Sequence, residues 1–173
     1  RKSFSEVNYE IVSNFDIWVD NIWNQAKNDY EFIAERNLDS LNLLNQKNEK
    51  KYIKIKVYND IKEAIGWCVV LKTKMVNHKQ FGNMYLGSIV DCLCYDKYEK
   101  LVISAGLKYL NDNQVDLIVS NQSSTRWCHG LKENGFIHGP SNFALAVSND
   151  LAKSFSDFKK SSSNFHINRG DGD

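Results

Sequence analysis

Two carboxylates that interrupt apolar runs are the side chains in this sequence best suited to acid–base chemistry. Asp91 lies within the apolar run at residues 84–94, and Asp116 lies near the start of the run at residues 115–119. A carboxyl group inside an apolar strand must be paired with a partner, or burial raises its pKa. A raised pKa suits a general base, so Asp91 is the best candidate for that role. The alternative is a structural hydrogen bond from Asp91 to a neighbouring loop or helix end.

Asp91 belongs to a longer segment, residues 86–136, in which apolar strands and helices alternate. The apolar run that ends at Cys94 and the run at residues 115–119, which Ser120 follows, predict parallel strands joined by a helix in a right-handed crossover. Ligand sites in such arrangements form at the carboxyl ends of the strands. Functional residues are therefore expected just after Cys94 and just after Ser120.

Further helices and strands are expected on both sides of this segment. Apolar residues recur with helical spacing from Phe15 to Ala26, and Asn14 can cap that helix. The remaining expected elements are a short helix around residues 38–44 and strands at residues 52–58, 64–72, 143–147 and 165–167. The Ser/Lys-rich stretch at residues 152–164 is predicted to be a surface loop.

Composition places the chain among ordinary globular proteins. Its 173 residues are 42% hydrophobic and carry a formal net charge of +1. A chain of this length can bury roughly 70% of the surface that it exposes when unfolded, so it is expected to form one domain. The near-zero charge argues against a nucleic-acid partner, and no apolar run is long enough to predict a membrane span.

The cysteines give no sign of a metal site or a disulfide framework. They occur in apolar contexts, and no pair has CxxC spacing. The four are Cys68, Cys92, Cys94 and Cys128. We expect reduced thiols in a cytoplasmic protein without a bound metal. The sequence begins at Arg1 rather than Met, so we expect a piece of a longer protein, with a second domain in the same chain as an open alternative.

The order helix, helix, strand, strand, long strand, helix, strand, helix, strand, strand resembles the GNAT (Gcn5-related N-acetyltransferase) fold. The likeness covers most of residues 15–167 and is sharpest at residues 115–136. There the polar Ser120-Asn121 end of the strand and the helix ending Glu133-Asn134-Gly135-Phe136 resemble the family's Asn-containing loop and "kLGF" ending. More loosely, residues 15–44 and the strands after them resemble the FemABX-related branch, in which GNAT domains occur in tandem.

The GNAT resemblance implies an α/β (α+β) three-layer fold, with a mixed central β-sheet and helices on both faces, formed by residues 1–173 as a single domain. It also implies acyl transfer from acetyl-CoA or another acyl-CoA to a small amine. In the family, the pantetheine arm of coenzyme A (CoA) pairs with two strands that splay apart. The pyrophosphate rests on free amides at the next helix N-terminus.

Carried onto this sequence, the resemblance assigns Asp91 as the base that deprotonates the amine. The thiolate-protonating tyrosine of many family members corresponds to Leu131, which has no acidic proton, so Cys128 and Tyr85 are the substitute candidates. The positions that correspond to the cofactor site are Leu93, Cys94, Tyr95, Lys97, Tyr98, Lys100 and Asn121.

The pyrophosphate loop departs from the family pattern. The family has Q/R-x-x-G-x-G/A, whereas residues 95–100 read Tyr-Asp-Lys-Tyr-Glu-Lys and contain no glycine. Asp96 and Glu99 have the spacing of a capping box, which would satisfy the free amides and repel an anion. Lys97 and Lys100 could offset that repulsion. The alternative function is therefore a non-catalytic GNAT-like domain that binds a ligand or a partner within a larger, tandem protein.

Overall fold

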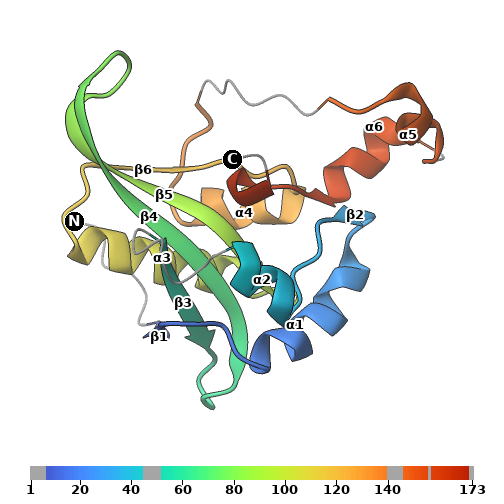
Figure 1. The fold of residues 1–173 in the computed structure, drawn as a ribbon, viewed down its shortest axis with the longest axis horizontal. Helices are drawn as coiled ribbons and strands as arrows, with labels where there is room; N and C mark the ends of the chain where they lie inside the picture. Colours follow the sequence, from blue (N-terminus) through green and yellow to red (C-terminus); the bar gives the residue numbers. More distant parts are fainter. Residues whose placement is uncertain (1–6, 45–51, 140–145, 156, 172–173) are drawn as a thin grey trace.

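The computed structural model describes residues 7–44, 52–139, 146–155 and 157–171 (Figure 1). The strands are β1 (Asn8–Val12), β2 (Phe32–Ile33), β3 (Tyr52–Tyr58), β4 (Ala64–His78), β5 (Gly82–Cys94), β6 (Leu117–Ser120) and β7 (Phe165–His166). The helices are α1 (Trp18–Ala26), α2 (Leu38–Leu44), α3 (Glu99–Asp112), α4 (Thr125–Glu133), α5 (Asn149–Lys153) and α6 (Phe158–Ser161). Short 3-10 turns are η1 (Lys27–Asp29), η2 (Ser162–Asn164) and η3 (Arg169–Asp171).

The main sheet has the strand order β1-β3-β4-β5-β6. Its first three pairings are antiparallel, and β5 and β6 are parallel, so the sheet is mixed as expected. The helix α3 connects the two parallel strands, which confirms the predicted crossover. A separate parallel pair joins β2 and β7.

Helices cover both faces of the sheet (Figure 1). Neighbouring residues of a strand point to opposite faces, and Trp67 and Cys68 of β4 show this directly. The Trp67 ring packs against Phe15 and against Trp18 of α1. On the other face, a Cβ added at Gly106 of α3 would lie 2.8 Å from the sulfur of Cys68. The predicted three-layer α/β arrangement is therefore confirmed.

Several expected elements differ from the observed ones. The N-terminal strand β1 was not predicted, because an edge strand with mixed exposure carries little periodic signal. The first helix begins at Trp18 with Ile17 as its N-cap, so the prediction of Asn14 as the cap is wrong. The predicted loop at residues 152–164 contains α6 and the end of α5. Side chains cap both helices, since Ser148 accepts from Leu151 N and Asp157 accepts from Lys160 N.

Two late strands were also expected. The strand predicted at residues 143–147 falls largely outside the described residues, and residues 146–147 have no regular structure. The last predicted strand is confirmed as β7, although it is one residue shorter. Within the described ranges, no helix has the length and apolarity needed to cross a membrane.

Candidate functional site

The parallel strands β5 and β6 separate at the edge where a site was expected. Their last paired residues are Ile89 and Ser120, whereas β5 continues to Cys94. The final residues of β5 are therefore unpaired with β6. The ends of both strands, with the residues that follow them, face a common gap.

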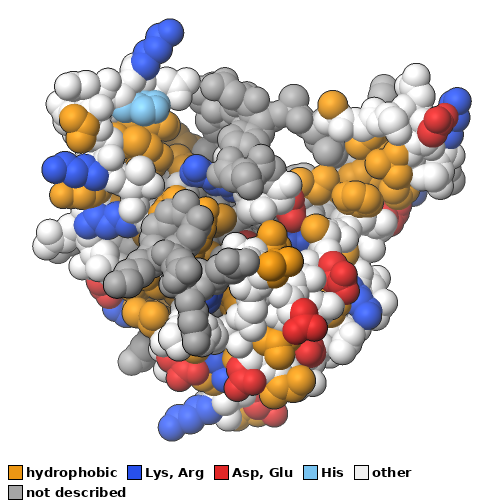
Figure 2. Space-filling model, viewed as in Figure 1, with side chains coloured by type: hydrophobic (Ala, Val, Ile, Leu, Met, Phe, Trp, Pro, Cys, Tyr) orange, Lys and Arg blue, Asp and Glu red, His pale blue; other side chains and the backbone are white. Residues whose placement is uncertain are grey.

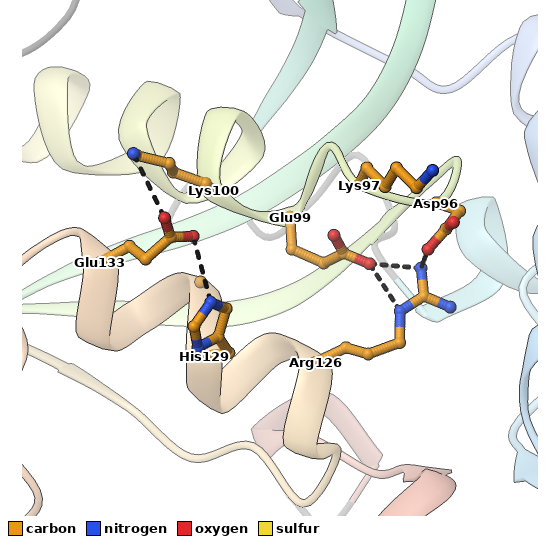
Figure 3. A pocket seen from close by; sticks show the side chains of 8 residues that line it. Asp96, Lys97, Glu99, Lys100, Arg126, His129 and Glu133 are labelled. Atoms are coloured by element: carbon orange, nitrogen blue, oxygen red, sulfur yellow. Dashed lines mark hydrogen bonds and ion pairs between the residues drawn. The ribbon is translucent and has the colours of Figure 1, made fainter.

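A pocket of about 310 Å³ lies beside this gap, between the first turn of α3 and the helix α4 (Figure 3). Its lining residues are Asp96, Lys97, Glu99, Lys100, Arg126, His129, Gly130 and Glu133. Gly130 allows the two helices to approach closely, since an added Cβ would lie 3.0 Å from Ile103 and 3.2 Å from Glu99. Charged side chains of both signs thus surround the N-terminus of α3.

The capping box predicted for α3 does not form. The helix begins at Glu99 with Tyr98 as its N-cap, and no side chain in the described structure caps it. Asp96 and Glu99 instead turn toward Arg126 of α4 (Figure 3). Both kinds of contact are charge-assisted, but the guanidinium brings a full positive charge and several donors in a fixed fork, which explains why the two carboxylates turn to it. The amides of the first turn consequently keep their capacity to bind an anion.

Arg126 is the centre of the charge network in this pocket. Its guanidinium lies 2.8 Å from Glu99 Oε1, 2.9 Å from Asp96 Oδ1 and 3.3 Å from Asp29 Oδ2. Glu99 is buried, whereas Arg126 is half-buried. Sequence reasoning missed Arg126, because nothing near it in the chain signals partners on η1 and α3.

The two lysines predicted to bind the cofactor line the same pocket. Lys97 is exposed, and Lys100 lies 3.4 Å from Glu133, which also approaches His129 at 3.8 Å. Four basic side chains, counting Arg126, therefore border the uncapped helix end. Burial raises the pKa of the nearby Cys94 thiol, so that group stays protonated.

Lys97 adopts a left-handed backbone conformation, with φ of 73°. A side chain at such a φ is strained, whereas glycine is not. We therefore expect Lys97→Gly to raise the free energy of unfolding by about 0.5–1 kcal/mol, measured by urea denaturation. Lys100→Gly, which removes the same side chain inside α3, serves as the control and should instead lower it by about 1 kcal/mol. A loss of stability in both variants would contradict the expectation.

Asp91 is paired with other side chains. Its position in an apolar strand had left two alternatives open, pairing with a partner or a pKa raised by burial, and the structure shows the first. Its Oδ1 accepts from Arg36 Nε at 2.8 Å and from Asn168 Nδ2 at 2.6 Å, and Trp67 Nε1 donates to Oδ2 at 3.3 Å. Burial alone would raise the pKa of Asp91, but Arg36 and the hydrogen bonds outweigh it and hold the pKa below its ordinary value. The raised pKa expected of a general base is thus absent, and the base role stays a prediction.

The two candidate acids lie on different elements. Tyr85 is near the start of β5, nine residues before Cys94 and thus roughly 30 Å away along the strand. Its ring lies under Lys72 Nζ at 4.2 Å, so the structure does not bring it to the gap. Cys128 lies on α4, and its thiol donates to the carbonyl oxygen of Gln122 at 3.4 Å. Burial raises the pKa of Cys128, which keeps the thiol protonated.

The other predicted site positions lie around the gap. Leu93 and Cys94 are buried at the end of β5, Tyr95 and Tyr98 are half-buried in the turn before α3, and Asn121 is half-buried after β6. Asp116 has a structural contact, since Tyr85 N donates to its carboxylate at 2.7 Å.

His166 is a buried site residue that sequence reasoning missed. Its ring stacks on Tyr30 at 4.8 Å and on Trp127 at 5.6 Å between ring centroids, and its Nε2 lies 2.7 Å from the carbonyl oxygen of Cys92. Burial, helped by the positive charge of Arg36, lowers the pKa of His166 to about 3. The imidazole is therefore neutral, and Nδ1 has no hydrogen-bond partner among the described residues.

Comparison with known proteins gives no sequence match, either to a family model or to a curated protein. Solved structures do match. A transcriptional regulator from Bacillus halodurans C-125 is 11% identical, with a TM-score of 0.57, over 82% of this chain and 100% of its own. A GNAT family acetyltransferase from Staphylococcus aureus is 16% identical, with a TM-score of 0.51, over 82% of this chain and 98% of its own. The chain has the GNAT fold.

An aminoglycoside acetyltransferase from an uncultured soil metagenomic sample, in complex with sisomicin, also shares the GNAT fold. It is 9% identical, with a TM-score of 0.53, over 82% of this chain and 97% of its own. Identities this low establish the fold and not the reaction. The predicted GNAT resemblance is confirmed at that level, and the FemABX-related branch stays a prediction.

Proposed function

We propose that this GNAT domain is an acyl-CoA-dependent N-acyltransferase that acts on a small amine. The observation that carries the proposal is the uncapped N-terminus of α3, which opens onto a pocket bordered by Lys97, Lys100 and Arg126. Free amides and the helix dipole favour a negative group there. The exposed Lys97 adds to that attraction.

The residues around the gap fit acyl-CoA, with acetyl-CoA as the simplest donor. Lys97, Lys100 and the amides of α3 would hold the pyrophosphate, and the edge of β5 beyond Ile89, which is not paired with β6, would hold the pantetheine arm. When bound, acyl-CoA supplies an activated acyl group as a thioester. Cys128 holds a proton on Sγ that can pass to a thiolate leaving group, because burial keeps that thiol protonated. Asp91 must lose its bond to Arg36 before it can take a proton from an amine.

A small amine is the acceptor in this proposal. One supporting observation is the shared fold with an acetyltransferase bound to sisomicin. A second is charge: the exposed carboxylates Asp16, Glu31, Glu35 and Asp39 lie on or next to α1 and α2 in the chain, and Figure 2 shows acidic side chains in this region, where they would attract a cation. A cytoplasmic location belongs to the proposal, since acyl-CoA and the four unpaired thiols suit a reducing compartment.

A non-catalytic GNAT-like domain is the second candidate, and the charge network favours it. Asp29, Asp96 and Glu99 neutralise Arg126, and Arg36 holds Asp91. Such a domain would bind a ligand or a partner, for example a second GNAT domain in the same chain. That second domain would then contain the active site.

Calorimetric titration with acetyl-CoA and with CoA tests the proposal. We expect a dissociation constant in the micromolar range, about −8 kcal/mol, for the unmodified chain. Lys97→Glu should weaken binding about tenfold, because it replaces a cation beside the pyrophosphate by an anion. The matched control is Lys79→Glu, an exposed charge reversal on the hairpin between β4 and β5, which should leave binding unchanged.

The two candidates give different results in this titration. No heat at millimolar acetyl-CoA would contradict the enzyme proposal and support the non-catalytic domain. Binding that responds equally to both lysine variants would show a general charge effect, and would contradict the assignment of the anion site to α3.

A further inference from the structure

Residues 165–171 cross the gap between β5 and β6 and contact both of its sides. Toward β5, His166 Nε2 lies 2.7 Å from the carbonyl oxygen of Cys92, and Arg169 Nη1 donates to Ser88 Oγ at 3.1 Å. A Cβ added at Gly170 would lie 3.3 Å from the carbonyl oxygen of Val90. Figure 1 shows the C-terminal turn, in dark red, beside the parting ends of the two strands.

The other side of the same segment joins the chain that follows β6. Ser123 N donates to the carbonyl oxygen of Ile167 at 3.0 Å, and Ile167 N donates to Ser123 Oγ at 2.9 Å. An antiparallel bridge pairs Gln122 with Asn168. Residues 165–171 therefore fill part of the gap much as an added strand would.

An ionic contact fastens the end of this segment. Both carboxylate oxygens of Asp171 accept from Arg36 Nη2, at 2.9 and 2.7 Å, and Asp171 Oδ2 also accepts from Asn168 N at 2.9 Å. The same Arg36 holds Asp91, which also accepts from Asn168. The carboxylate proposed as the base is thus covered by the segment that fills the gap.

The segment fits the gap imperfectly. Three buried polar atoms lack a partner among the described residues: His166 Nδ1 in the segment itself, and Gln122 Oε1 and Ser124 Oγ on the chain that follows β6. A buried polar atom without a hydrogen bond costs free energy, so a ligand that displaced the segment and supplied the missing hydrogen bonds would be favoured. The Asp171–Arg36 contact therefore holds residues 165–171 in the gap, although these three buried polar atoms form no hydrogen bond within the described structure.

We infer that residues 165–171 are an internal inhibitor of the site, and that they must leave the gap before an acyl-CoA and an amine can enter. The inference rests on the proposed function and adds regulation to it. The segment and the amide-containing pantetheine arm compete for the end of β5, and departure of Asn168 and Asp171 uncovers Asp91. A ligand then binds with an apparent affinity reduced by the fraction of molecules in which the gap is open.

Weakening the ionic contact should therefore strengthen binding. We expect Asp171→Asn in the full chain to lower the dissociation constant for acetyl-CoA about tenfold, measured by calorimetry. Asp91 keeps its bond to Arg36 in this variant, so the fold should persist. The control is Asp112→Asn, which makes the same charge change in an exposed pair with Lys108 and should leave the dissociation constant unchanged.

Hydrogen exchange gives a second measurement on the unmodified chain. Saturating acetyl-CoA should reduce the amide protection of residues 165–171 while it increases that of α3. If the unmodified chain and Asp171→Asn bind acetyl-CoA with equal affinity, and the protection of residues 165–171 does not change, the inhibitor inference is overturned. The acyltransferase proposal is then left standing. No binding to either the unmodified chain or Asp171→Asn would overturn both.

Discussion

Lowering the pH from 7 to 5 is expected to reduce the free energy of unfolding by about 2 kcal/mol through His166 alone. Burial lowers the pKa of His166 to about 3 in the folded chain, whereas an unfolded histidine titrates near pH 6.5. Between these values the unfolded chain binds a proton that the folded chain does not. Stability therefore rises with pH across this window, by about 1.4 kcal/mol per unit.

Asp91 does not add to this slope. Its folded pKa is lowered, so its contribution is fully present above the unfolded value near 3.9 and is lost only at lower pH. Urea denaturation at pH 5, 6, 7 and 8 measures the effect. His166→Gln should flatten the curve between pH 5 and 7, and the control His129→Gln, at an exposed histidine, should not. An unchanged slope in His166→Gln would contradict the assignment.

Local sequence patterns were sufficient for most strands of the main sheet. The alternation of Ile53, Ile55 and Val57 with lysines marks β3, and the continuous apolar runs mark β5 and the start of β6. Burial of one face requires a fixed period, so these elements leave a readable trace in the chain. The strand β1 leaves little trace, because it lies at the sheet edge and most of it is exposed.

The chemistry of the site could be predicted only in part. An acid inside an apolar strand needs a partner, so the pairing of Asp91 was one of two expected outcomes, but no local pattern points to Arg36, 55 residues earlier. The Arg126–Asp29 contact spans 97 residues, and Arg36–Asp171 spans 135. Such pairs form because the fold brings distant segments together. A local rule predicted that Asp96 and Glu99 form a capping box, but both carboxylates pair with the distant Arg126 instead.

Replacing Arg36 by methionine is expected to be the most destabilising single change in this site. Arg36 is 2% exposed and lies against two carboxylates, Asp91 and Asp171. Its removal leaves an uncompensated buried charge on Asp91. We expect a loss of about 3–5 kcal/mol in the free energy of unfolding at pH 7. Lys108→Met, which breaks the exposed pair with Asp112, should cost less than about 1 kcal/mol.

A double variant separates the charge from the shape of the side chain. Arg36→Met combined with Asp91→Asn removes both charges, so its loss should be smaller than the sum of the two single losses by about 1–3 kcal/mol. A loss in the double variant equal to the sum of the two single losses would contradict a direct ion pair as the cause. Arg36 joins β5 to the segment that fills the gap. The same coupling energy therefore also measures the strength of the Arg36–Asp91 contact that keeps Asp91 from accepting a proton. A strong coupling would mean that an active site on this chain requires the Arg36 contacts to break first.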